Sequence, residues 1–229
     1  HSFCARVLGG HADAAGLPRG FRVADNAEVR LLREDVITSI MSRSLIPGRE
    51  RDSIPAGTLR AVLEAGWEVI GHARRLLHTP ASFKQALHAG EAGDTGQSRY
   101  EQQVAGVYVT LFEEYQKAKR RAGIVDHADL IVKTYWLLRR NGELLSRLRS
   151  QFLYIIVDEF QDTNRAQLEL LRLLSAEGFS NVTVVGDDKQ AIYEWRRGWQ
   201  ACADCVRGPR CGSSIGRGPR SARVRHRCV

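Results

Sequence analysis

The sequence predicts an α/β fold in which a mainly helical region precedes a short parallel sheet. Apolar residues recur every three or four positions through roughly the first 150 residues, whereas 152–158 is a short apolar run rich in β-branched and aromatic residues that ends at Asp158, and 182–185 is a second short, mostly apolar stretch. The first pattern is typical of amphipathic helices, and the second is typical of strands buried on both faces of a parallel sheet. With 229 residues, 43% of them hydrophobic, the chain is long enough for one or two domains with a buried core.

Helices are predicted wherever apolar side chains repeat on one helical face. These segments are residues 29–40, 59–77, 104–115 and 130–138. Breaks that contain Gly, Pro or polar residues separate them, at 46–48, 79–80 and 90–96. The opening residues also look helical, and since the chain does not begin with Met we expect its true start to lie upstream.

A strand, a helix and a second strand follow in quick succession. Residues 152–158 form the first predicted strand. Asn164 is a favourable N-cap with Gln167 three residues on, three leucines then share one helical face, and Gly178 is a suitable stop. The second strand is predicted at 182–185. A right-handed βαβ unit of this kind places the loops after both strands at the same edge of the sheet.

The net charge of +8 is concentrated at the C-terminal end. Residues 197–229 hold eight Arg against one acid, a net charge of +7, together with four of the five Cys, so that residues 1–196 carry +1 and a single Cys, Cys4. That body has the composition of a protein from a reducing compartment, and we expect it in the cytoplasm. No apolar stretch approaches the roughly 18 residues of a membrane span, so we expect no membrane partner.

The last part of the chain lacks apolar periodicity, and we expect no packed structure there. Cys202-x-x-Cys205, with Cys211, His226 and Cys228, could be a zinc site. The spacing is only loosely zinc-like, no hydrophobic scaffold surrounds it and Arg crowds it, so the sequence disfavours zinc.

Two adjacent carboxylates, Asp158 and Glu159, lie at the carboxyl end of the first predicted strand. The edge of a parallel sheet holds such side chains at the crevice where nucleotides bind. One carboxylate can hold Mg²⁺, usually through water, while its neighbour orients and deprotonates an attacking water. The alternative is a solvated acidic turn, which the apolar strand before the pair and the Gln-Asp-Thr after it disfavour.

A second set of polar and aromatic residues follows the second strand, at the same predicted edge. Gly186 permits a tight turn, and Gln190 can donate a hydrogen bond to a phosphate oxygen. Tyr193 and Trp195 offer ring faces on which bases can stack, and Arg196 can meet a backbone phosphate. Taken singly, each aromatic residue is more often part of a core.

Together these segments resemble a known family. Asp158-Glu-Phe-Gln-Asp-Thr-Asn164 and Gly186-Asp-Asp-Lys-Gln-Ala-Ile-Tyr-Glu-Trp-Arg196 are similar, in sequence and spacing, to motifs II and III of the UvrD/Rep-like superfamily 1 ATP-dependent DNA helicases. Tyr115-Gln116 and Val125-Asp126-His-Ala-Asp129-Leu resemble the segment before motif II, and His1-Ser2-Phe3 resembles the end of a Thr-x-His-Ser-Phe motif.

This resemblance, which covers roughly residues 1–196, implies a partial RecA-like P-loop NTPase domain with a parallel sheet and a mainly helical insertion. Residues 1–20 and 126–196 would belong to RecA-like domain 1A. Residues 21–125 would form the helical 1B-like insertion that meets duplex DNA, and 197–229 an irregular Arg/Gly/Cys-rich tail.

The resemblance also implies a nucleotide site with ATP and Mg²⁺ as cofactors. Asp158 would match the Mg²⁺-linked aspartate, with the ion held through water. Glu159 would match the carboxylate that activates water, and Gln190 the glutamine that senses the γ-phosphate and couples it to DNA.

The implied partners are single-stranded and duplex DNA. His1, Ser2, Tyr193, Trp195 and Arg196 would match or lie near the contacts to the single strand. In the intact enzyme, ATP hydrolysis would drive translocation and duplex unwinding, typically 3′ to 5′, in DNA repair or recombination.

Two departures from the family pattern matter. No G-x-x-x-x-G-K-[ST] phosphate loop occurs among the 229 residues, so we expect this chain alone not to hydrolyse ATP at a useful rate. After Arg196 the family continues with Gly-Ala and a second RecA-like domain, whereas this chain reads Arg197-Gly198-Trp199. We interpret residues 197–229 as a shifted reading frame or the product of a broken gene.

A second interpretation is a non-catalytic nucleic-acid-binding module that uses the basic tail and the helical region. Short basic runs occur on the predicted helices, at 74–75, 117–121 and 139–140. Such runs are usually solvated faces, although a few could touch phosphates, and the sequence does not choose between these. Histidines such as His127 have no metal-like pairing and are most simply surface or core residues.

Overall fold

The computed structural model describes residues 1–44, 54–91 and 99–186. It contains two compact units, His1–Val132 and Lys133–Val229, which are described separately. Within the described ranges, no helix is both long and apolar enough to cross a membrane.

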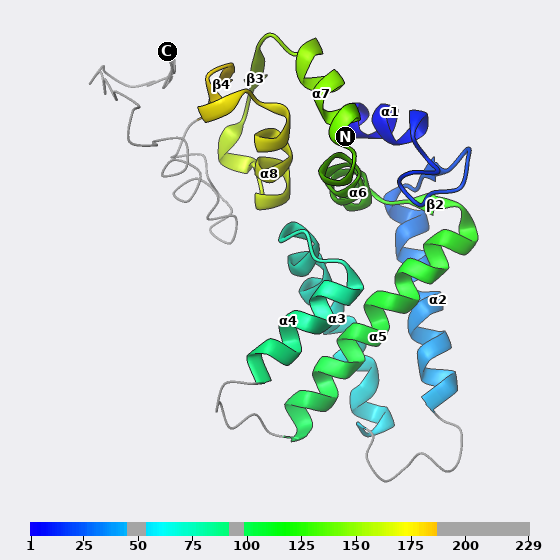
Figure 1. Ribbon diagram of the computed structural model, residues 1–229. Helices are drawn as coiled ribbons and strands as arrows, with labels where there is room; N and C mark the ends of the chain where they lie inside the picture. The colour runs from blue at the N-terminus through cyan, green and yellow to red at the C-terminus, as the bar shows by residue number, and fades with distance from the viewer. Residues whose placement is uncertain (45–53, 92–98, 187–229) are drawn as a thin grey trace. The chain divides into compact units, whose positions relative to one another are not determined.

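The first unit consists mainly of helices (Figure 1). The predicted helices at 29–40, 104–115 and 130–138 are confirmed, and the one at 59–77 ends two residues early, at Arg75, before Leu77 leaves the helical region with a φ of 65°. The helices are α1 (Ser2–Gly10), α2 (Asn26–Ser44), α3 (Ala56–Arg75), α4 (Pro80–Glu91), α5 (Arg99–Ala122) and the first part of α6 (His127–Arg140).

Helix α4 was not predicted, because Thr79-Pro80 reads only as a break in the sequence. The break is the start of a helix, with Pro80 at its first position, where its missing N–H costs nothing. Thr79 and Ser82 cap this end reciprocally: Thr79 Oγ1 accepts a hydrogen bond from the Ser82 N–H (3.2 Å), and Ser82 Oγ accepts one from the Thr79 N–H (2.9 Å).

Two short parallel strands bracket helices α2 to α5. In β1 (Arg22–Val23) and β2 (Ile124–Val125), Arg22 lies opposite Ile124 and Val23 opposite Val125. Backbone hydrogen bonds from Arg22 N to Gly123 O (3.2 Å) and from Ala24 N to Val125 O (2.9 Å) extend the pairing. The segment that contains α2 to α5 therefore begins and ends at neighbouring points, next to the paired strands β1 and β2.

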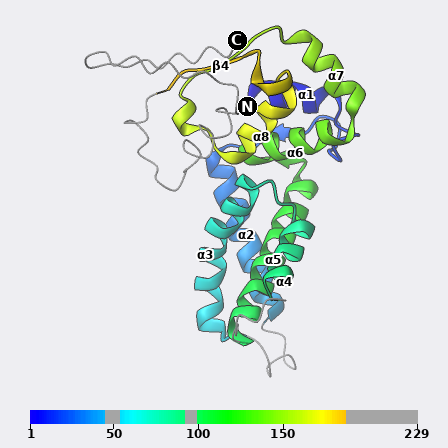
Figure 2. The same cartoon turned by 60° about the vertical axis from the view of Figure 1, so that its left-hand side comes forward.

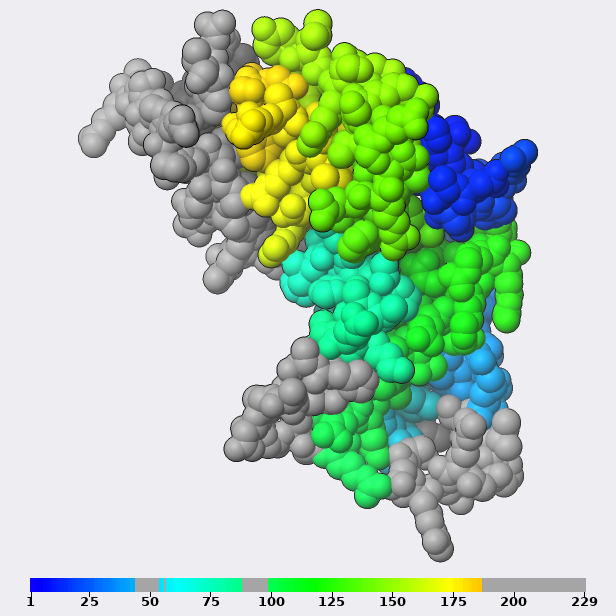
Figure 3. All heavy atoms as spheres, viewed as in Figure 1, coloured from blue at the N-terminus to red at the C-terminus, as the bar shows by residue number. Residues whose placement is uncertain are grey.

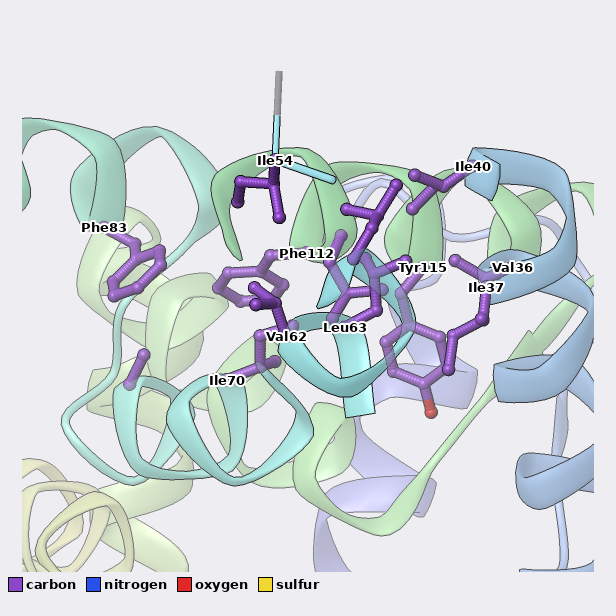
Figure 4. Packing of buried hydrophobic residues seen from close by; sticks show 13 residues of the cluster. Val36, Ile37, Ile40, Ile54, Val62, Leu63, Ile70, Phe83, Phe112 and Tyr115 are labelled. Atoms are coloured by element: carbon purple, nitrogen blue, oxygen red, sulfur yellow. The ribbon is translucent and has the colours of Figure 1, made fainter. Parts of the chain in front are cut away.

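The core of this unit lies between its long helices. Helix α2 packs on α3 and α5, and α4 packs on α5 (Figure 2). In the space-filling view, α4 and α5 share one face of the unit (Figure 3). Apolar side chains from all four helices and the segment before α3 meet in the interior (Figure 4). They include Val36, Ile37, Ile40, Ile54, Val62, Leu63, Ile70, Phe83, Phe112 and Tyr115.

The second unit contains the predicted strand, helix and strand. After α7 (Gly142–Gln151), which was not predicted, come β3 (Ile155–Val157), α8 (Arg165–Leu174) and β4 (Val182–Val184). Short 3₁₀ turns, η2 (Phe160–Asp162) and η3 (Glu177–Phe179), lie on either side of α8. Strands β3 and β4 are parallel, with Ile155 opposite Val182 and Val157 opposite Val184. The predicted parallel pair is confirmed.

The prediction that the first strand is buried on both faces is wrong. Ile155 and Val157 pack against the small core of this unit, but Leu153, Tyr154 and Ile156 are 79%, 80% and 74% exposed. Successive side chains of a strand point to opposite faces, and nothing in the described ranges covers the face on which Ile156 lies. The second strand is buried as predicted, since Val182 and Val184 are each less than 9% exposed.

The start of α8 is confirmed in detail, but its end is not. Asn164 Oδ1 accepts a hydrogen bond from the Gln167 N–H (3.1 Å), and Gln167 Oε1 accepts one from the Asn164 N–H (2.9 Å), which is a complete capping box. The helix ends at Leu174 rather than at Gly178, which lies in η3 with a φ of 65°.

Candidate nucleotide and DNA site

Asp158 and Glu159 lie in an exposed turn, residues 158–162, at the carboxyl end of β3. This acidic turn is fastened to the end of β4 by two backbone hydrogen bonds. The Val185 N–H donates to Val157 O (2.8 Å), and the Phe160 N–H donates to Val185 O (3.0 Å). The segments that follow the two strands therefore meet at one sheet edge, as predicted.

The backbone of the acidic turn is strained at Glu159. This residue has a φ of 50° and a ψ of 43°, the left-handed region that side chains other than Gly and Asn rarely occupy. Phe160, buried in the core of the second unit, anchors the turn on one side. The buried Gln161 donates a side-chain hydrogen bond to Glu159 Oε2, so the carboxylate has a fixed partner.

Asp158 can accept a metal ion. Its Oδ1 accepts a hydrogen bond from the Glu159 N–H (3.0 Å), and its Oδ2 has no protein partner in the part of the chain that the structure describes. Carboxylate oxygens are the ligands that Mg²⁺ prefers, and Mg²⁺ usually retains several waters. An exposed carboxylate with one free oxygen at a sheet edge fits that chemistry.

Position 186 requires glycine because its backbone lies very close to residues of the acidic turn. A Cβ at this position would lie 2.5 Å from Gln161 Oε1, 3.2 Å from the Phe160 backbone N and 3.3 Å from the Gln161 backbone N. The sequence predicts a tight turn at Gly186. The structure gives a different reason, since the backbone after β4 presses directly against the acidic turn.

Some of the predicted site residues lie outside the described residues. They are Gln190, Tyr193, Trp195 and Arg196, and the cysteine cluster of the tail lies outside them too.

His1 and Ser2 lie at the start of α1, in the first unit. The His1 ring packs edge-on against the ring of His127, with 5.0 Å between the ring centroids. Both histidines are exposed, and His127 is the first residue of α6. Sequence reasoning treated His127 as an ordinary histidine. Its position inside the family-like segment Val125 to Leu130 is the only signal that could have singled it out.

A second group of charged residues in the first unit is fully buried. Arg74 at the end of α3 and Lys119 near the end of α5 face Asp126 and Asp129 at the start of α6. We call these four residues the buried charge cluster. Each is at most 6% exposed.

The contacts of the buried charge cluster are dense. Arg74 binds both carboxylates, through Nη1 to Asp126 Oδ2 (2.9 Å) and through Nη2 to Asp129 Oδ1 (2.8 Å), and its Nη2 also donates to Asp126 Oδ1. Lys119 Nζ donates to Asp126 Oδ2 (3.0 Å) and to Asp129 Oδ2. The Tyr115 hydroxyl donates to Asp126 Oδ2 (2.8 Å).

Burial and pairing act in opposite directions on these groups. Burial raises the pKa of Asp126, but Arg74 and Lys119 outweigh it and hold this pKa well below its usual range. Burial also raises the pKa of Asp129, and Lys119 and Arg74 again lower it overall. For Lys119, burial and the charge of Arg74 lower the pKa, and the two carboxylates offset this only in part. The carboxylates are therefore ionised at neutral pH.

The burial of Arg74 and Lys119 corrects the interpretation of two basic runs. The sequence left open whether 74–75 and 117–121 are solvated faces or phosphate contacts. Arg74 and Lys119 are neither, because they are 5% and 2% exposed and are bound to carboxylates. Asp126 and Asp129 belong to the segment that resembles the one before motif II, but their partners could not be predicted from the sequence, because about 50 residues of chain separate α3 from α6.

The chain is similar in sequence to known proteins. The model of the UvrD/REP helicase N-terminal domain matches residues 1–201. The chain belongs to the UvrD/REP helicase family. Curated relatives named ATP-dependent DNA helicase PcrA, from Staphylococcus aureus and Staphylococcus epidermidis, are 34% identical over 196 residues.

Those 196 residues are 86% of this chain and 23% of each PcrA, so this UvrD/REP helicase chain spans about a quarter of the length of its curated relatives. The resemblance drawn from the motifs is confirmed. The match also fits the fold, in which a parallel βαβ unit and a mainly helical unit occur in one chain.

Proposed function

We propose that this chain is the part of an ATP-dependent DNA helicase that carries the acidic residues of the nucleotide site and one side of the single-strand path. The observation that carries the proposal is the acidic turn. Its two exposed carboxylates are held at a sheet edge by Phe160 and Val185, directly beside the start of the Gly186 segment. Membership of the UvrD/REP helicase family supports the same role.

In the nucleotide site, we assign metal binding to Asp158 and water activation to Glu159. Mg²⁺ would neutralise charge on the phosphates of ATP when bound. Asp158 would hold it through water, using the oxygen that has no partner among the residues that the structure describes. Glu159, held by Gln161, would accept a proton from the attacking water. Gln190 would contact the γ-phosphate and couple its presence to DNA.

In the single-strand path, we assign contacts to two groups of residues. His1 and Ser2 form one group, and the exposed ring of His127 beside His1 supports its inclusion. Tyr193, Trp195 and Arg196 form the other, as base-stacking and phosphate-binding groups. We expect the intact protein to move 3′ to 5′ along the strand and to act in DNA repair or recombination.

We also propose a domain assignment. Residues 1–20 and 126–196 would form part of RecA-like domain 1A, and residues 21–125 its helical 1B-like insertion, which meets duplex DNA. The pairing of β1 with β2 supports this, because an inserted segment must leave and rejoin its parent domain at neighbouring points. We interpret residues 197–229 as an irregular Arg/Gly/Cys-rich tail that comes from a shifted reading frame or a broken gene.

The 229-residue chain alone is proposed to be inactive as an ATPase, since no Gly-Lys-Thr phosphate loop occurs among its residues. The test is ATP hydrolysis by the purified chain with Mg²⁺ and single-stranded DNA. We expect no activity above that of the Glu159→Gln variant. Hydrolysis that Glu159→Gln abolishes would show that these residues suffice and would contradict the proposal of inactivity.

A second candidate is a non-catalytic nucleic-acid-binding module, favoured by the net charge of +7 in residues 197–229. Binding of a fluorescent single-stranded oligonucleotide separates the two functions. Loss of affinity in Trp195→Ala, with little change when residues 197–229 are deleted, supports the helicase strand path. Binding that disappears with the tail and depends steeply on salt supports the electrostatic module.

A further inference from the structure

The buried charge cluster connects the ends of helices α3 and α5 to the start of α6. Arg74 comes from the last turn of α3, and Lys119 comes from the last turn of α5, together with the Tyr115 hydroxyl one turn earlier. Asp126 and Asp129 come from the start of α6. The cluster contains two cations and two carboxylates, so its formal charges balance.

The two aspartates also cap α6. Asp126 Oδ1 accepts a hydrogen bond from the Asp129 N–H (2.9 Å), and Asp129 Oδ2 accepts one from the Asp126 N–H (3.2 Å). His127 lies between them in the chain. Its backbone is therefore held between two residues that are themselves bound to α3 and α5, while its ring stays exposed and packs against His1.

We propose that the buried charge cluster is a joint that positions His127 for contact with a nucleic-acid strand, so that the attachment of α3 and α5 sets the geometry of the His1 and His127 pair. This rests on the proposed function of that pair as part of the single-strand path. Asp126, Asp129, Arg74 and Lys119 act as positioning residues, since none is exposed enough to touch the strand.

Physical reasons favour a joint over a general stabilising contact. A buried ion cluster is often no more stabilising than apolar packing, but it permits only arrangements in which every charge is paired. Any displacement of the start of α6 against α3 or α5 separates a carboxylate from a cation at low dielectric. The position of His127 is thereby restricted more narrowly than apolar side chains alone would restrict it.

The test compares two variants of the full 229-residue chain. Lys119→Met removes one cation, and Tyr115→Phe removes only the hydroxyl that binds Asp126 and keeps the ring in the core. Two quantities are measured: the nuclear Overhauser effect between the ring protons of His1 and His127, and the affinity for a single-stranded oligonucleotide. Arg60→Met, which removes exposed ion pairs with Glu34 and Glu64, is the control.

We expect the contact between the two rings to weaken in Tyr115→Phe and to weaken further in Lys119→Met. The affinity should fall roughly three- to tenfold in Lys119→Met, the range of a modest coupling energy, and stay unchanged in Arg60→Met. If Lys119→Met does not fold, Tyr115→Phe decides alone. Folded variants that keep both the ring contact and the affinity of the parent chain would overturn the proposal.

The two proposals can fail separately. If the parent chain binds no single-stranded DNA, the assigned role of the histidines fails. The ring contact between His1 and His127 still decides whether the cluster positions His127.

Discussion

The chain holds two acidic pairs with opposite surroundings. In the buried charge cluster, Asp126 and Asp129 are 6% and 3% exposed and each is bound by both Arg74 and Lys119. In the acidic turn, Asp158 and Glu159 are exposed, neither has an ion-pair partner in the described ranges, and the backbone of Glu159 is left-handed. Both pairs follow a strand, β2 for the first and β3 for the second, and both lie in segments that resemble parts of the helicase family's sequence.

The different surroundings distinguish carboxylates that stabilise the fold from carboxylates that are available to bind a metal ion or activate water. Carboxylates whose oxygens are filled by protein donors cannot also bind an ion or activate water. Carboxylates that are exposed and held in a costly backbone conformation are available for both. The first pair therefore belongs to the fold, and we assign the second to the nucleotide site.

Acid should produce the largest effect on stability, through the first pair. The folded-state pKa values of Asp126 and Asp129 lie below their unfolded values, so their stabilisation is complete above the unfolded pKa and is lost as the pH falls toward the folded one. At pH values below about 4, we expect the free energy of unfolding to decrease by up to about 1.4 kcal/mol per pH unit for each carboxylate. Urea unfolding at a series of pH values measures this.

The same titration tests the first pair by substitution. Asp129→Asn should flatten the acid dependence, because it removes one of the two carboxylates that Arg74 and Lys119 bind. An acid profile as steep in Asp129→Asn as in the parent chain would contradict the assignment.

Gly186→Ala should have an intermediate effect, confined to the acidic turn. The added Cβ would overlap Gln161 Oε1 and press on the backbone N atoms of Phe160 and Gln161. We expect a loss of about 1 to 3 kcal/mol in the free energy of unfolding, the usual result of overpacking. Gly142→Ala is the matched control, because a Cβ there meets nothing within 4 Å.

Glu159→Gly should have the smallest effect, with the opposite sign. Glycine adopts a φ of 50° without the steric cost that Glu159 bears, although it also increases the freedom of the unfolded chain. We expect a gain of about 0.5 kcal/mol in the free energy of unfolding, measured by urea denaturation. A decrease of more than about 1 kcal/mol in the free energy of unfolding would show that the Glu159 carboxylate stabilises the fold and is not reserved for binding a ligand.

Local patterns predicted the elements whose signals lie within one short segment. The capping box of Asn164 and Gln167 and the parallel pairing of β3 with β4 follow from residues close in sequence. Helix α4 was missed, since a Pro that starts a helix and one that breaks it look the same without the capping bonds around it, and the short helix α7 was missed as well.

The remaining features depend on contacts between distant segments. The burial of Arg74 depends on Asp126, 52 residues away, and the need for Gly186 depends on the acidic turn. The exposure of Ile156 depends on what covers one face of β3, which no property of the strand itself can indicate. The contact between the rings of His127 and His1 depends on α1, which precedes α6 by more than 100 residues.

One experiment tests the central claim most directly: neutralise each acidic pair and compare the free energies of unfolding in urea. In Asp126→Asn/Asp129→Asn, Arg74 and Lys119 stay buried without counter-charges, and we predict a loss of at least about 3 to 5 kcal/mol. In Asp158→Asn/Glu159→Gln, we predict a change within about 0.5 kcal/mol, because both side chains are exposed. Equal losses in the two variants would contradict the division between a structural pair and a chemical pair.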